Sequence, residues 1–148
     1  MIIDQNGSRE MSKIAGGCLC GGVRYSSEVG PSLTAVCHCK HCQRQTGSSF
    51  SILVAMPKGS LEIKGESLAA FDDVGESGLP VIRHFCRDCG SPIFSDVSAM
   101  SDVDFLKAGT LDDASWLQPQ VHIWCSHMQP WVSIEADTQR FEKNPPAG

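Results

Sequence analysis

The chain has 148 residues, of which 41% are apolar and 20% are charged, and its formal net charge is −5. This composition is typical of one soluble globular domain and excludes disordered and fibrous classes. The longest apolar run, Ile52 to Met56, is far shorter than the roughly 20 residues of a membrane-spanning helix. Nucleic acid is not an expected partner, because proteins that bind it usually carry a basic surplus.

Short strands separated by glycine, proline and aspartate turns dominate the pattern along the chain. In chain order we expect strands at 22–26, 33–37, 51–56, 61–63, 68–71, 81–85, 103–108, 121–125 and 131–135. One helix is predicted from Lys40 to Thr46, with Gly47 at the left-handed position that ends many helices. These elements predict a mainly β, antiparallel fold with little helix.

The two ends of the chain differ from its middle. Residues 1–13 are polar, and residues 142–148 contain Pro145-Pro146. We expect a flexible N-terminal arm at 1–13 and a flexible tail at 142–148. The first ten residues hold no hydrophobic signal segment, which predicts a cytoplasmic protein.

Eight cysteines make this composition unusual. Seven of them fall in three tight groups: Cys18-Leu-Cys20, Cys37-His-Cys39-Lys-His-Cys42 and Cys86-Arg-Asp-Cys89. Disulfides rarely persist in a reducing cytosol, and disulfide frameworks spread their cysteines along the chain, whereas metal sites bunch them. The groups therefore predict zinc sites.

Cys86 and Cys89 have the spacing of a zinc knuckle, and Gly90 tolerates the positive φ that turns the chain back. A structural zinc takes four ligands, so this knuckle needs two more. Cys18 and Cys20 would supply them, because residues i and i+2 of a strand face the same side. The sequence thus predicts one structural zinc held by four cysteines.

The middle group brings three thiols together within a six-residue segment, Cys37 to Cys42. Three protein ligands and one open position are the arrangement of a catalytic zinc. A fourth protein ligand would instead close the site, and the candidates for it are Cys125, His38, His41, His84, His122 and His127.

Cys125 is the strongest candidate for a fourth ligand by number, because eight cysteines can divide into two sites of four. On a strand, Cys125 would share a face with Val121 and Ile123, which favours a core position over a ligand role. His38 lies between two cysteines and is expected to point to the opposite face. No histidine is assigned a ligand or catalytic role.

Charge is distributed unevenly around the middle group. Between Val29 and Leu61 there is no Asp or Glu, whereas Lys40, Arg44 and Lys58 are present. These cations would form a positive pocket for a carboxylate-bearing thiol, or they balance the thiolates or are solvated. A zinc with three thiolates polarises water weakly but is suited to holding a substrate thiol as thiolate.

Three segments resemble the glutathione-dependent formaldehyde-activating enzyme family: Gly16 to Tyr25, Cys37 to Phe50 and Phe85 to Phe94. Gly109 to Asp113 and His122 to Trp131 resemble it further. The resemblance implies a tent-like arrangement of coiled antiparallel sheets around two zinc sites. It assigns the structural zinc to Cys18, Cys20, Cys86 and Cys89, and the active-site zinc to Cys37, Cys39 and Cys42.

The resemblance also implies a carbon–sulfur lyase or synthase that joins glutathione, or a similar thiol, to formaldehyde or another small aldehyde. We therefore expect residues 14–141 to form a single zinc-binding catalytic domain. Lys40 or Arg44 would bind substrate carboxylates. Hydrogen bonds to the developing oxyanion would come from Thr46, Ser48 and Ser49, although a helix stop and turn at Thr46-Gly47-Ser48 is the favoured explanation for that segment.

Two hypotheses from other classes stay open. A non-enzymatic zinc module would have a closed second site and an exposed apolar patch for a protein partner. A redox or metal-buffering protein would use Cys37, Cys39 and Cys42 as reactive thiols.

Overall fold

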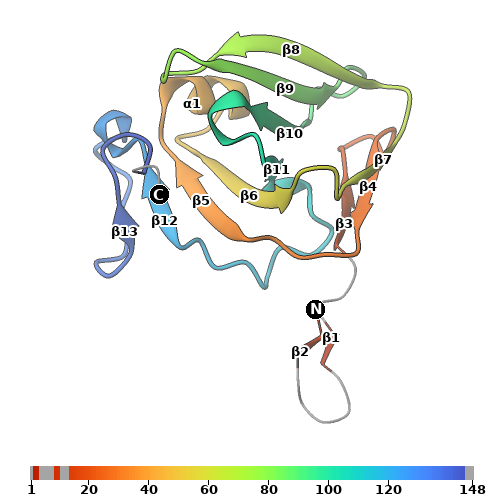
Figure 1. The fold of residues 1–148 in the computed structure, drawn as a ribbon, viewed down its shortest axis with the longest axis horizontal. Helices are drawn as coiled ribbons and strands as arrows, with labels where there is room; N and C mark the ends of the chain where they lie inside the picture. The colour runs from red at the N-terminus through yellow and green to blue at the C-terminus, as the bar shows by residue number, and fades with distance from the viewer. Residues whose placement is uncertain (1, 4–8, 11–13, 146–148) are drawn as a thin grey trace.

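A computed structural model describes residues 2–3, 9–10 and 14–145, and its strands form three sheets (Figure 1). The largest has eight strands, in the spatial order β13 (Gln139–Arg140), β12 (Val121–Ile123), β5 (Leu33–Cys37), β6 (Ser51–Pro57), β11 (Val103–Lys107), β10 (Pro92–Val97), β9 (Pro80–Cys86) and β8 (Leu68–Val74). The second contains β3 (Ile14–Gly17), β4 (Arg24–Ser27) and β7 (Glu62–Lys64), and the third pairs β1 (Ile2–Ile3) with β2 (Arg9–Glu10).

Helical structure is scarce, so the mainly β prediction is confirmed. The elements are α1 (Lys40–Thr46) and the short 3-10 turns η1 (Ser98–Met100), η2 (Ala108–Thr110) and η3 (Cys125–His127). The predicted bounds of α1 are correct, and Gly47 ends the helix with a φ of 65°. No helix among the described residues has the length and apolar character needed to cross a bilayer.

Several strand predictions need correction. β3 and β10 were not predicted, and the strand expected at 131–135 is absent, since these residues form a turn and irregular chain. β12 ends at Ile123, because Trp124 adopts a left-handed φ of 55°, and this places Cys125 in η3 instead of on the strand. β12 also runs parallel to β5 and β13, whereas the other ladders are antiparallel.

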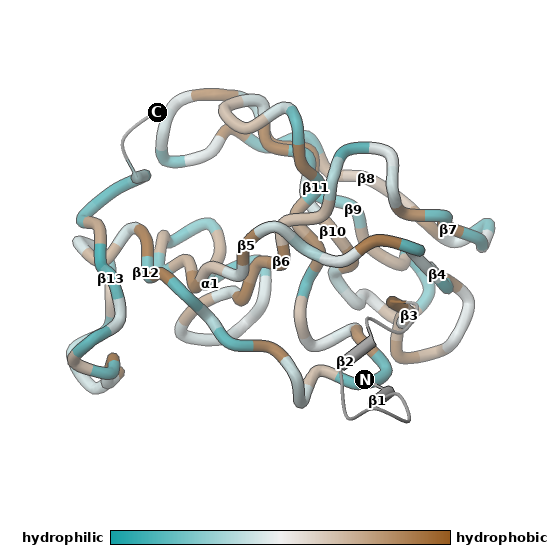
Figure 2. The backbone as a smooth tube through the Cα atoms, turned by 60° about the horizontal axis from the view of Figure 1, so that its bottom comes forward, coloured by the Kyte–Doolittle hydropathy of each residue, from teal (hydrophilic) through white to brown (hydrophobic). Residues whose placement is uncertain are grey.

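Side-chain alternation gives the large sheet two different faces. The inner face carries one core, which includes Cys37, Leu53, Phe105 and Ile123. The outer face packs against the small sheet in a second core, which includes Val54, Phe94, Leu106 and, from β3 and β4, Ile14 and Tyr25. Figure 2 shows the apolar stretches gathered where the central strands run together.

The C-terminal segment packs beside η3. Trp124 Nε1 donates to Asn144 Oδ1 at 2.7 Å, and Ser126 Oγ donates to the Glu142 carbonyl at 2.7 Å. These contacts extend beyond residue 141, where the sequence placed the domain boundary. Most of the arm predicted at 1–13 lies outside the described residues.

Gly16 provides a test of how closely β3, β4 and η2 pack. A Cβ at Gly16 would collide with the Thr110 carbonyl oxygen and the Tyr25 hydroxyl, whereas a Cβ at Gly109 would meet open space. Overpacking of this kind costs about 1–3 kcal/mol. We expect denaturant unfolding to show that loss for Gly16→Ala and less than half of it for the control, Gly109→Ala. Equal stabilities would contradict the packing described here.

Candidate metal centres and active site

Four cysteines meet where the small sheet touches the end of β9. Cys18 and Cys20 follow β3, Cys86 ends β9, and Cys89 lies in the next turn. Their Sγ atoms all lie within 4.8 Å of one another. The Sγ atoms of Cys18 and Cys20 are 3.6 Å apart, and those of Cys20 and Cys86 are 3.7 Å apart.

These separations suit a tetrahedral zinc ion. With zinc–sulfur bonds of about 2.3 Å, tetrahedral ligands would lie about 3.8 Å from one another. Hydrogen bonds with Ser91 lower the pKa of Cys89 to about 5, which favours its thiolate form, whereas hydrogen bonds with the other three cysteines raise the pKa of Cys20 despite a backbone hydrogen bond from Gly22. The Val23 N–H donates to Cys18 Sγ at 3.2 Å. Thus this group of four thiols fits zinc.

The backbone reaches this arrangement differently from the prediction. Cys18 and Cys20 lie on a turn and not on one strand face. Gly21, with a φ of 80°, permits the turn, and its N–H donates to the Cys18 carbonyl at 3.1 Å. Gly90 behaves as predicted, with a φ of 81° and an N–H···O bond of 2.7 Å to Cys86.

The second group of thiols lies where β5 passes into α1. Cys37 ends β5, Cys39 caps the N-terminus of α1, and Cys42 lies in its first turn. The Cys39 Sγ accepts a hydrogen bond from the Cys42 N–H at 3.3 Å. All three side chains are buried, and their Sγ atoms lie within 4.8 Å of one another. Cys37 and Cys39 do not share a strand face, because β5 stops at Cys37.

No fourth His, Cys, Asp or Glu of the described residues joins these three thiols. His38 points away, as predicted, and its Nε2 lies 2.9 Å from His122 Nδ1. His41 contacts Asp73 at 2.9 Å, and His84 stacks on Phe94. Cys125 is half-buried in η3 and belongs to neither thiol group.

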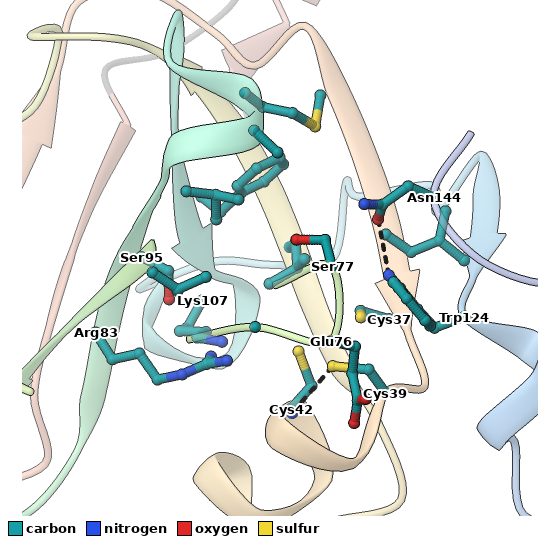
Figure 3. A pocket seen from close by; sticks show the side chains of 18 residues that line it. Cys37, Cys39, Cys42, Glu76, Ser77, Arg83, Ser95, Lys107, Trp124 and Asn144 are labelled. Atoms are coloured by element: carbon teal, nitrogen blue, oxygen red, sulfur yellow. Dashed lines mark hydrogen bonds between the residues drawn. The ribbon is translucent and has the colours of Figure 1, made fainter. Parts of the chain in front are cut away.

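The three thiols line a cavity of about 630 Å³, counted with its open mouth (Figure 3). Strand register explains the wall formed by the inner face: Arg83 lies opposite Ser95, Lys107 opposite Leu53, and Cys37 opposite Ser51. The other lining residues include Glu76 and Ser77 from the β8–β9 turn, Met100, Trp124 and Asn144.

Two buried cations face the thiols. Arg83 Nε donates to Asp73 Oδ2 at 2.8 Å, and Lys107 Nζ donates to Ser51 Oγ at 2.9 Å. Hydrogen bonds with Cys37 and Cys39 hold the pKa of Cys42 well below its usual range, and the charges of Lys107 and Arg83 act in the same direction. The cavity therefore favours an anionic Cys42 Sγ, whereas hydrogen bonds with Cys39 and Cys42, together with burial, raise the pKa of Cys37.

The predicted substrate contacts lie elsewhere. Lys40 and Arg44 are exposed on α1 and do not line this cavity. Thr46 Oγ1 donates to the Cys42 carbonyl at 2.8 Å, and with Ser48 it borders a separate depression. Lys58 pairs with Asp104 at 2.7 Å and Asp96 at 2.8 Å.

The cavity residues that come from β9, β10 and β11 were not predicted from the sequence. The sequence does indicate one of them, Lys107. It lies on the same face of β11 as Val103 and Phe105, and that face is buried. For Glu76 and Asn144 no local pattern indicates the site, because turns bring them to it from distant parts of the chain.

Fold and thiol groups together define a class of mainly β proteins with two candidate metal centres. This chain belongs to the glutathione-dependent formaldehyde-activating enzyme family, whose model matches residues 13–127.

Named relatives agree with this membership, and a solved structure shares the fold. A putative glutathione-dependent formaldehyde-activating enzyme of Penicillium rubens is 24% identical over 127 residues, covering 80% of this chain and 65% of the relative. One of Podospora anserina, bearing the same name, is 26% identical over 110 residues, covering 70% and 50%. The chain thus spans half to two thirds of their lengths. The crystal structure of a Rhodobacter sphaeroides protein shares the fold, with a TM-score of 0.55 and 21% identity over 71% of this chain and 91% of that one.

The four-thiol group is expected to stabilise the fold, because ions held between distant segments contribute folding free energy. Cys89→Ser should lose one bound metal ion and more than about 3 kcal/mol of the free energy of unfolding. Denaturant unfolding and metal analysis measure the two effects. The matched control is Cys125→Ser, which should keep its metal content and lose less than about 1 kcal/mol. Similar losses in both variants would contradict a metal role for Cys89.

Proposed function

We propose that this chain is a zinc-dependent enzyme that adds a small thiol, glutathione or a similar compound, to formaldehyde or another small aldehyde, or catalyses the reverse. One observation carries this proposal: three buried thiols lie together at an open cavity without a fourth protein ligand among the described residues. The family and the names of the relatives supply the substrates.

Cys37, Cys39 and Cys42 would hold the active-site zinc, and Cys18, Cys20, Cys86 and Cys89 the structural one. Bound by three thiolates, zinc would lower the pKa of a substrate thiol and keep its sulfur nucleophilic. We place the protein in the cytoplasm, where cysteine thiols stay reduced and remain available as metal ligands. We place the catalytic domain in residues 14–141, against which Glu142 and Asn144 also pack.

The cavity residues would prepare the reaction. Lys107 and Arg83 offset the negative charge that gathers around the sulfur atoms, and Phe105 and Trp124 exclude water from them. A low local dielectric strengthens both charge interactions.

Proton transfer needs a further group, and Glu76 is in a position to provide it. Its side chain lines the cavity beside Cys39 (Figure 3), with Oε1 3.8 Å from His41 Nε2. In the forward direction the substrate sulfur attacks the carbonyl carbon, a sulfur–carbon bond forms and the carbonyl π electrons move to oxygen. We propose that Glu76 accepts the proton of the thiol and then donates it to this oxygen, which gives the hemithioacetal.

The two alternative classes predict different behaviour. A binding module needs a closed second site, and the described residues offer no fourth ligand for one. A redox protein would use these thiols for reversible oxidation, with release of metal. Only the enzyme hypothesis requires a small thiol to enter the metal's coordination shell.

Cobalt(II) substitution tests this requirement, because its visible spectrum reports geometry and thiolate count. Titration with glutathione should change the spectrum of the cobalt protein and reach saturation. Cys39→Ser should keep its fold and one metal ion, lose the spectral change, and lose activity with glutathione and formaldehyde by about 100-fold or more. Cys125→Ser is the matched control.

An unchanged spectrum with both sites loaded would count against the enzyme hypothesis and favour a closed binding module. Full activity in a folded Cys39→Ser protein would reject the assignment of this group as the active site.

A further inference from the structure

Three hydrogen-bond donors converge on one wall of the cavity, opposite Trp124 and Asn144 (Figure 3). Arg83 and Ser95 lie directly across from each other on β9 and β10. Ser95 also lies opposite Phe105 of β11, so Lys107, two residues further on, is its diagonal neighbour. Exposed fractions are 6% for Arg83, 2% for Ser95 and 5% for Lys107. The sheet thus fixes three buried polar groups beside the thiols.

Much of the hydrogen-bonding capacity on this wall is unused within the described part of the chain. Ser95 Oγ is fully buried without a partner. Lys107 has three N–H donors, one of which reaches Ser51 Oγ, and none forms an ion pair with a described carboxylate. Arg83 uses Nε to bind Asp73. A buried donor left unsatisfied costs about 1–3 kcal/mol, and a ligand bound in the cavity would remove that cost.

Charge balance with the thiols explains only part of this arrangement. It accounts for two cations near Cys37, Cys39 and Cys42. It does not account for a neutral hydroxyl, Ser95, held between them without a partner. A group that accepts hydrogen bonds from a hydroxyl and from two cations at once satisfies all three, and a carboxylate does so with two oxygen atoms.

We propose that Arg83, Ser95 and Lys107 form a carboxylate subsite that selects an acidic substrate. The inference rests on the proposed function, which brings a thiol and a carbonyl compound into this cavity. The carboxylate belongs to the thiol or to the carbonyl compound, and binding measurements distinguish the two. Lys40 and Arg44, predicted from sequence for such a contact, lie outside the cavity.

Isothermal titration calorimetry with the metal-loaded protein tests the subsite through binding alone. The thiol arm compares 3-mercaptopropionate with 3-mercaptopropionamide, and the carbonyl arm compares glyoxylate with its amide. Propionate, which has no reactive group, serves as the third ligand. We expect the carboxylate to bind about 10–100-fold more tightly than the amide in one arm, since charged hydrogen bonds dominate the difference.

Variants then show which residues cause the preference for the carboxylate. Lys107→Met and Ser95→Ala should reduce the preference to threefold or less. Lys64→Met, which removes an exposed lysine of β7, is the matched control and should keep it. Ser95→Ala should also melt at the same temperature or higher, because it removes an unsatisfied buried hydroxyl; a merely structural serine would make the variant less stable.

The outcomes separate this inference from the proposed function. Equal binding of carboxylate and amide in both arms would overturn the subsite, as would a preference that survives in both variants. Equally tight binding of propionate and 3-mercaptopropionate, each preferred over the amide, would uphold the subsite and count against the proposed function, because the thiol would then contribute nothing to binding.

Discussion

Neighbouring residues on each strand of the large sheet point to opposite faces, and this constraint separates the two thiol groups. On the inner face, the end of β5 presents Cys37 to the cavity. On the outer face, Cys86 at the end of β9 meets Cys18 from the turn after β3, within the other core. A shift of one residue in register would exchange the faces and disperse both groups. The sheet therefore determines which cysteines lie together.

The three thiols are buried, so negative charge on their sulfur atoms needs positive charge nearby, and the surrounding strands provide it. Anionic sulfur in a buried site is costly without compensating charge. Arg83 and Lys107 supply that charge, and Asp73 holds Arg83 while also contacting His41 on α1. The edge strand β8 is thereby tied to the helix that carries Cys42. The same contacts position the β8–β9 turn, with Glu76, at the mouth of the cavity.

Spacing along the sequence was enough to predict the parts of the site that are local. The three thiols of the middle group, the turn at Gly90 and the bounds of α1 depend on contacts between near neighbours. The orientation of Cys125 was harder, because the left-handed Trp124 ends β12 and no propensity anticipates that conformation at a tryptophan. Part of the cavity wall depends on strand pairing between residues more than fifty positions apart, such as Lys107 and Leu53. Cations near the thiols in sequence therefore proved a poor guide to cations near them in space.

Lys107 shows how stability and function are linked in this cavity. A methionine would fill much the same volume without the cost of burying a charge. Ser51 provides a single hydrogen bond to Lys107, which offsets only a small part of the free-energy cost of burying an ammonium group. The buried position of Lys107 is explained if its remaining N–H donors interact with negative charge, first that of the thiols and then that of the substrate. The negative charge of the thiols does not explain Ser95, because its hydroxyl is neutral. A substrate carboxylate would explain it, because that group would accept a hydrogen bond from Ser95 as well as from Lys107.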